Sequence, residues 1–468
     1  MKTLLKLLVI AVLVLPLSGI AAKAQSTKQQ IQDLKQRIEA IQLQNQQQIE
    51  QLKQQIELLE NARQADQEKI AEIKTKQETV DEDAWYNKFL AKYDKGFVFE
   101  SADDKGLKFK MKFTALAQLQ GFVNDTDTKL TQTNFQIRRL ELKWDGYAFA
   151  PWFYYTFMID PASSTLLKDA YLTAAYQKEI GPRVGQWKVP FNREELTSTA
   201  GLQIIERSIV NSQFSLERTR GAALMGGIGA NNNFSYSAGV FNAQGNNSSK
   251  GVSNLDSNLL YVGRVQLGLA GDDDYKFNSN GTFATAKAYD MVPNFAKNPT
   301  FVVGFGAAAV PGLNCDRDVP NGGVCPRIAQ LGFQTTDFTQ ITGDMNFKMK
   351  YFNVEAEYDG RWLNPDTGQS TAYDQGFRVQ AGVFLMPKTV ELAARYAWIG
   401  YDTGSSVVPP DTSEPDVQWE LTPELNYYIS HDHRWKVMLS YTFQRNEFTQ
   451  DAPDVDANVV RAQLQAYF

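Results

Sequence analysis

The feature that most constrains this chain is a long series of short alternating segments. From Gly106 onward we identify sixteen segments of roughly ten residues in which apolar and polar side chains alternate, among them KFKMKFTALAQLQGF, VGQWKVPF and RWKVMLSYTFQR. Many end in aromatic residues, and no apolar run reaches the about eighteen residues of a membrane helix. A soluble β-sandwich needs far fewer strands for one core. The pattern predicts an all-β fold, a 16-stranded antiparallel transmembrane β-barrel over residues 106–468.

The connections between these segments agree with a barrel in an outer membrane. If the first segment runs outward, the outer connections are long, as at 192–218 and 312–337, and several inner ones are tight, as at KEIGP and SHDH. A long inner connection at 271–298 breaks the pattern and leaves the strand register around 257–311 open. The last segment alternates and ends on Phe468, as final strands of such barrels commonly do. We expect the outer membrane of a Gram-negative-type bacterium.

The first hundred residues have a different composition. Residues 1–24 combine a basic start, an apolar run and a small-residue end, which predicts a signal peptide cleaved before Gln25. Residues 26–80 contain no Gly, Pro or aromatic residue, and residues 81–105 read as a linker or short hairpin. Within 26–80 the apolar residues follow heptad spacing, beginning with Ile31, Leu34, Ile38 and Ile41. This predicts a periplasmic coiled coil of two or three strands, with a solvated Gln-rich spacer as the alternative.

Charge, cysteines and motifs exclude several classes of function. The net charge is −6, so a broad basic surface for nucleic acid is not expected. Cys315 and Cys325 lie close together in a loop-like segment and predict a local disulfide in an oxidising compartment. Both histidines are far from these thiols in sequence, so we expect no metal site and no cofactor. The chain has no G-x-S-x-G and no HExxH motif, and we expect no enzymatic activity.

The polar side of each strand identifies candidate pore residues. A charge on the lipid face costs a few kcal/mol near the membrane midplane, so charged residues on strands should face the lumen. Lysines at alternate positions of one strand, beside cations of the next, indicate a basic wall, although a solvated lumen of mixed charge is the alternative. The predicted anion-binding or pore-lining residues are Lys108, Lys110, Lys112, Arg139, Lys143, Asp169, Lys188 and Arg264.

The strand VGQWKVPF gives a specific orientation. By the same rule its apolar residues, Trp187, Val189 and Phe191, should face lipid or a neighbouring subunit. Lys188 then faces the channel, directly before the polar segment NREELTS.

Several stretches within residues 167–224 resemble the phosphate-selective porins O and P. They are LKDAYLTAAY, VGQWKVPFNREELTS, IIERSIVNSQF and RTRGAAL. The resemblance implies a sixteen-stranded homotrimeric barrel whose third loop folds into the lumen as a constriction, with anions passing along Arg and Lys side chains. Residues 192–218 are the third outer connection here. Their candidate constriction residues are Arg193, Glu194, Glu195 and Arg207.

These inferences combine into one expected function. We expect an outer-membrane porin, embedded in lipid, that passes small inorganic anions by diffusion, with phosphate or polyphosphate as the substrate. The alternative is a general porin of weak selectivity that also acts as an envelope tether, with the coiled coil bound to peptidoglycan or to a periplasmic partner.

Overall fold

The computed structural model describes most of the strand-rich part of the chain. It covers residues 46, 50, 53–71, 89–101, 108–127, 129–177, 179–228, 233–243, 258–270, 299–315, 324–366, 368–402, 415–448 and 453–468. The chain divides into two compact units, Met1–Asn87 and Lys88–Phe468. The signal peptide, most of the predicted coiled coil and the connection 271–298 lie outside the described residues.

The first unit contributes one described helix. Residues 53–71 are helical, and the heptad residues Ile56, Leu59 and Ile70 are exposed on it. Of the helices described, none is both long enough and apolar enough to span a membrane.

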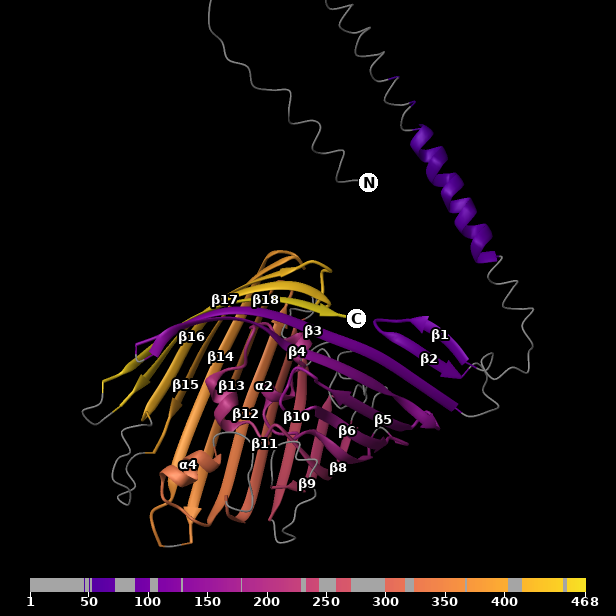
Figure 1. Cartoon of the computed structure of the whole chain (residues 1–468). Helices are drawn as coiled ribbons and strands as arrows, with labels where there is room; N and C mark the ends of the chain where they lie inside the picture. The colour runs from indigo at the N-terminus through magenta and orange to yellow at the C-terminus, as the bar shows by residue number, and fades with distance from the viewer. Residues whose placement is uncertain are drawn as a thin grey trace, which may run out of the picture. The chain divides into compact units, whose positions relative to one another are not determined.

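The second unit is built from antiparallel strands that close on themselves (Figure 1). Sixteen of the described strands, β3 to β18, pair each with the next, and β18 pairs with β3. This confirms the predicted 16-stranded barrel. The strands are β3 (Lys108–Thr126), β4 (Lys129–Phe149), β5 (Phe153–Ile159), β6 (Leu167–Ala174), β7 (Gly181–Lys188), β8 (Arg218–Ile228), β9 (Phe234–Asn242), β10 (Leu259–Ala270), β11 (Thr300–Leu313), β12 (Thr336–Met349), β13 (Phe352–Pro365), β14 (Ala372–Met386), β15 (Val390–Gly400), β16 (Val417–Tyr428), β17 (Trp435–Glu447) and β18 (Val455–Tyr467).

The seam of the barrel joins the two ends of the strand series. Val460 of β18 lies opposite Val123 of β3, and the last residue, Phe468, exchanges two backbone hydrogen bonds with Ala115. Beyond this point the edge of β3 pairs with β2 (Phe97–Ser101), which forms a hairpin with β1 (Phe89–Tyr93). The hairpin therefore occupies the part of the β3 edge that β18 does not reach, within the interval predicted as a linker or short hairpin.

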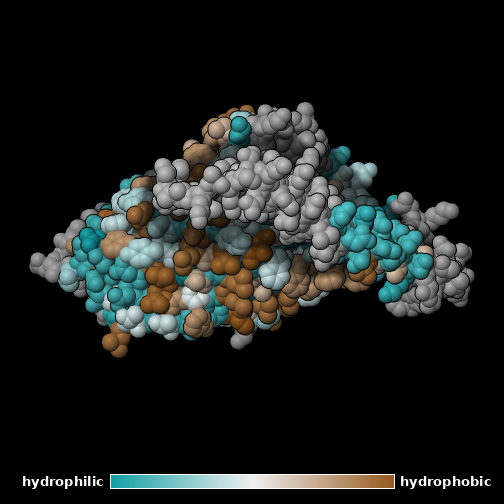
Figure 2. Space-filling view, turned by 90° about the horizontal axis from the view of Figure 1, so that it is seen from above, coloured by the Kyte–Doolittle hydropathy of each residue, from teal (hydrophilic) through white to brown (hydrophobic). Residues whose placement is uncertain are grey.

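Side chains alternate between two environments along the barrel strands. On β14, Phe377 and Val379 are exposed on the outer face, whereas Arg378 and Gln380 are buried inside. β16 repeats this alternation, with exposed leucines and buried acids. Figure 2 shows apolar side chains, in brown, grouped on the outer face of the described strands. An apolar exterior around a polar interior is the arrangement of a membrane barrel with a wet or filled lumen.

One predicted orientation is wrong. Trp187, Val189 and Phe191 are buried inside the barrel, where they pack with Leu216 and Phe241. The rule that apolar strand residues face outward fails here, because the chain that follows β7 folds into the lumen and forms a dry core of its own. An apolar set next to such a core does not mark the lipid face.

The same core extends to a second connection. Cys315 and Cys325 form a disulfide with Cα atoms 5.5 Å apart, the pair that the sequence predicts. The bond joins the end of β11 to α4 (Val324–Gln330). Val324 and Ile328 of α4 belong to the cluster that contains Phe191. The disulfide therefore fixes α4 beside the segment that enters the lumen.

Gly185 in β7 provides a test of how closely β7 packs against β6. Its φ is +130°, and a Cβ placed there would lie 2.2 Å from the Ala170 carbonyl oxygen of β6. We expect Gly185→Ala to destabilise the folded barrel by about 1–3 kcal/mol, measured as a lower thermal midpoint in detergent. Gly263→Ala in β10 is the matched control, since a Cβ there meets nothing within 4 Å. Equal midpoints for the two variants would contradict the strain assigned to Gly185.

Candidate functional site

The connection between β7 and β8, residues 189–217, is called loop 3 below. It contains α2 (Arg193–Leu196), the 3-10 turn η3 (Thr199–Gly201) and α3 (Ile209–Phe214). Ser208 caps α3, because its Oγ accepts a hydrogen bond from the backbone N–H of Asn211 at 3.0 Å. Figure 1 shows α2 within the ring of strands. Loop 3 therefore lies inside the barrel, at the position of the predicted constriction loop.

One side of loop 3 is fixed to the wall formed by β12 to β16. Arg193 contacts Glu355 at 2.7 Å. Glu194 forms an ion pair with Arg378 at 3.0 Å and accepts a hydrogen bond from Arg395 at 3.2 Å. All five side chains are at most 3% exposed. Charges without water are stable only when they are paired and hydrogen-bonded. We call these five residues the arginine–carboxylate network, and they hold loop 3 against this wall.

Loop 3 is fixed to the opposite wall by Glu206. Its two carboxylate oxygens accept from Arg138 of β4 at 2.7 and 3.0 Å, and one of them also accepts from Gln120 of β3 at 3.0 Å. Burial alone would raise the pKa of Glu206, but the hydrogen bonds and charges of Arg138 and Arg139 lower this pKa to about 2. Loop 3 thus crosses the lumen and is anchored at both sides.

Glu195 and Arg207 stabilise loop 3 internally. Glu195 Oε2 lies 3.3 Å from Arg207 Nε, and its Oε1 lies 3.6 Å from Lys188 Nζ. Burial favours the neutral acid, yet the charges of Arg207 and Lys188 outweigh it and lower the pKa of Glu195 to about 2. Arg207 also donates to the Thr197 carbonyl oxygen at 3.0 Å. Within the described part of the chain, the hydrogen bonds and the ion pair of Arg207 are all made to loop 3 itself.

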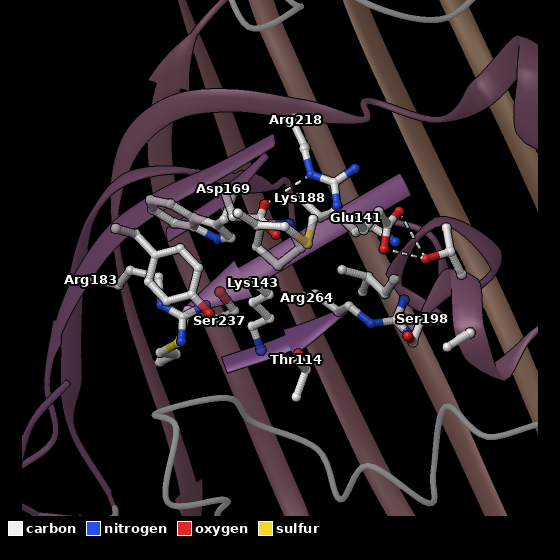
Figure 3. Close-up of a pocket in the computed structure, with 18 of the residues that line it drawn as sticks. Thr114, Glu141, Lys143, Asp169, Arg183, Lys188, Ser198, Arg218, Ser237 and Arg264 are labelled. Atoms are coloured by element: carbon white, nitrogen blue, oxygen red, sulfur yellow. Dashed lines mark hydrogen bonds and ion pairs between the residues drawn. The ribbon is translucent and has the colours of Figure 1, made fainter. Parts of the chain in front are cut away.

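A cavity of about 410 Å³ remains between loop 3 and the wall formed by β3 to β10. We call it the loop 3 cavity, and Figure 3 shows its charged and hydroxyl side chains facing one space. Among the described residues, five cations and two carboxylates line it, which leaves an excess of three positive charges (5 − 2). These are Lys143, Arg183, Lys188, Arg218 and Arg264, with Glu141 and Asp169.

The acids around the loop 3 cavity are largely engaged. Asp169 accepts from Arg218 at 2.9 Å, and Glu141 accepts from the Thr199 hydroxyl at 2.8 Å. Other acids that pair with these cations, Asp145 with Lys143 and Asp344 with Arg264, do not line the cavity. The lining is therefore more positive than the total of nearby charges, because five cations line the cavity whereas the acids paired with several of them do not.

The structure brings together only some of the predicted pore residues. Lys143, Asp169, Lys188 and Arg264 all line the loop 3 cavity. Arg139 lies elsewhere, beneath loop 3, where it donates to Gln118 at 2.8 Å and lies 3.6 Å from Glu206. Lys108, Lys110 and Lys112 are on the lumen parity of β3 but do not line the cavity. In the β3–β4 register, Lys112 of β3 lies opposite Asp145 of β4. Asp145 is two residues along β4 from Lys143, which lies opposite Thr114.

Two cationic residues of the cavity were missed from the sequence. Arg218 follows loop 3 directly, and Arg183 lies on the same side of β7 as Trp187. The misassigned parity of β7 hid Arg183. Its charge was the available signal, because an arginine on the lipid face is costly. The outward residue here is Val184, which is 52% exposed. Beyond Gly185, whose φ is +130°, the alternation stops, since Trp187 and Lys188 both line the loop 3 cavity.

The closed barrel, its apolar exterior and the charged cavity beside an inserted loop define a membrane channel. The profile of the family "Phosphate-selective porin O and P" matches residues 109–293. The match covers less than half of the chain, and together with the closed barrel it supports an outer-membrane porin.

Comparison with curated proteins gives no match. Solved structures resemble the chain at low identity. The outer membrane channel DcaP of Acinetobacter baumannii is 10% identical, with a TM-score of 0.48, covering 78% of this chain and 99% of DcaP. OmpT, an outer membrane protein of Vibrio cholerae, is 10% identical, with a TM-score of 0.47 and coverage of 80% and 98%. OprB of Pseudomonas putida is 9% identical, with a TM-score of 0.46 and coverage of 78% and 95%.

Proposed function

We propose that the barrel is a diffusion channel selective for small anions, phosphate among them, and that loop 3 is its constriction. The observation that carries this proposal is the lining of the loop 3 cavity, with five cations against two carboxylates. A cluster of cations in a narrow space with low-dielectric walls concentrates anions and repels cations. Arginine forks suit phosphate oxygens, and lysine adds a point charge.

The two adjacent glutamates of loop 3 are compatible with anion passage. Glu194 and Glu195 are 1% and 5% exposed, and neither lines the loop 3 cavity. Their charges are used by the arginine–carboxylate network and by Arg207 and Lys188. We assign them a structural role, which is to hold loop 3 in place.

Zero-current potentials in planar bilayers under a KCl gradient test the proposed selectivity. The full chain should give a potential of the sign for chloride permeation, and added phosphate should lower the chloride current in a concentration-dependent way. A potential of the opposite sign would overturn the anion channel. Anion selectivity without any effect of phosphate would favour the general porin of weak selectivity.

The exposed heptad residues of 53–71 support a second role for the first unit. Apolar Ile56, Leu59 and Ile70 on a solvated helix favour pairing with further copies of the same helix. We propose that residues 26–80 form a periplasmic coiled coil that joins the subunits of a homotrimer and links the barrel to peptidoglycan or a periplasmic protein. Deletion of 26–80 should leave conductance unchanged and abolish co-sedimentation with isolated peptidoglycan. Unchanged co-sedimentation would refute a peptidoglycan link through this segment.

A further inference from the structure

The loop 3 cavity has a marked apolar side. Besides its charges, it is lined by Leu116, Met158, Tyr171, Trp187, Leu196 and Met225. A hydrated inorganic anion gains nothing from such a surface, because apolar side chains offer it no hydrogen bonds. A solute with an apolar body does gain, since contact with these side chains removes apolar area from water. The lining therefore suits an amphipathic solute better than a wholly polar one.

The apolar side is joined directly to a cation. The Arg183 guanidinium carbon lies 4.1 Å from the centre of the Tyr171 ring and 5.6 Å from that of Trp187. The two ring centres are 6.1 Å apart. Arg183 is also oriented by Thr173, whose hydroxyl accepts from its Nε at 2.9 Å. Charge and aromatic surface are thus presented side by side in a fixed geometry.

Two buried polar atoms in this part of the lining have no hydrogen-bond partner among the described residues. They are Trp187 Nε1 and Ser237 Oγ. Both residues line the loop 3 cavity, and they are 4% and 9% exposed. An indole N–H can only donate, and a buried donor without an acceptor is unfavourable. Because this nitrogen is closed to solvent, a solute oxygen reaches the indole N–H only if the ring turns toward the cavity.

We propose that the loop 3 cavity is a binding subsite for small organic anions that carry a carboxylate or phosphate group on an apolar, flat body. The anionic group contacts the cations of the lining, and the body lies against Tyr171, Trp187 and Leu196. This inference rests on the proposed anion channel and adds a preference among anions. It assigns the selectivity for organic anions to the apolar side of the cavity and the selectivity for charge to its cationic side.

Block of the KCl current by benzoate, acetate and phosphate tests the preference. Benzoate and acetate carry the same charged group, so their difference reports the apolar body. We expect benzoate to reach half-block at a concentration about tenfold lower than acetate, which corresponds to about 1.4 kcal/mol, and lower than phosphate. Equal half-block concentrations for benzoate and acetate in a channel that is still anion-selective would overturn this inference and leave the proposed function intact.

Three variants locate the effect. Leu196→Ser removes apolar surface from the cavity and should reduce the benzoate-to-acetate ratio several-fold. Trp187→Phe reduces the aromatic surface of the lining and should lower the same ratio to a smaller extent. Ile209→Ser is the matched control, because Ile209 is also a half-buried aliphatic residue of loop 3 but packs on the cluster that contains Ala397 and Ile399 and does not line the cavity. An equal loss of the ratio in Ile209→Ser would contradict the assigned subsite. If Trp187→Phe fails to fold, the benzoate-to-acetate ratio of Leu196→Ser still decides whether the apolar lining binds the body of the solute.

Discussion

Replacing Glu194 with glutamine is expected to release loop 3 from the β12–β16 wall and to raise the single-channel conductance. The substitution keeps the shape of the side chain but removes the charge that Arg378 and Arg395 share at 3.0 and 3.2 Å. Both arginines are at most 3% exposed, so water cannot replace the lost partner. Breaking a buried ion pair costs about 3–5 kcal/mol. The barrel should therefore also unfold at a lower temperature.

Single-channel recordings and thermal unfolding in detergent measure the two effects together. Glu217→Gln is the control, since Glu217 is an exposed carboxylate at the end of the same loop. It should change neither conductance nor thermal midpoint by a comparable amount. A Glu194→Gln channel with the conductance of the original chain would mean that the remaining anchors, such as Glu206, are sufficient to hold loop 3.

Reversing the charge of Lys143 should move the selectivity of the channel toward cations. Lys143 lines the loop 3 cavity beside Glu141, and its partner Asp145 lies 3.1 Å away. With a glutamate at position 143, these three neighbouring positions would all be acidic. One unit charge at contact distance changes the energy of an ion by about 1 kcal/mol in water. Reversal changes two units, so the chloride permeability should fall by up to about thirtyfold. The potassium permeability should rise, and the chloride-to-potassium permeability ratio therefore falls further.

Zero-current potentials in a KCl gradient report this ratio, and the shift should shrink at high salt because of screening. Lys143→Gln should give an intermediate value. Lys129→Glu carries the same charge change at the exposed first residue of β4 and should leave the ratio nearly unchanged. An equal shift in Lys129→Glu would show that net charge, rather than the loop 3 cavity, sets the selectivity.

The barrel itself follows from local patterns. A period of two is visible in each strand, and its repetition, the long and short connections and the terminal Phe468 are read from neighbouring residues only. The cysteine pair was predictable for the same reason, because only ten residues separate Cys315 from Cys325. Lys143, Asp169, Lys188 and Arg264 were found because a charge on a membrane strand has one tolerable side.

The alternation rule failed where a second layer of protein entered the lumen. Trp187 and Phe191 were placed outward because apolar strand residues normally face lipid, but loop 3 supplies an apolar surface inside. The partners of Glu194 could not be predicted either. Arg378 and Arg395 lie about two hundred residues further along the chain, and only the closure of the barrel brings them to loop 3.

The sequence by itself therefore determined a closed membrane barrel and its strand order, because both depend on the alternation and spacing of residues close together in the chain. The loop that enters the lumen was implied by the resemblance of residues 167–224 to a porin family. The tertiary structure alone decided which charges face a solute and which hold the protein together. Burial inside the closed barrel commits Arg193, Arg378 and Arg395 to carboxylates of loop 3 and its wall, and it leaves the cations of the loop 3 cavity facing the open space.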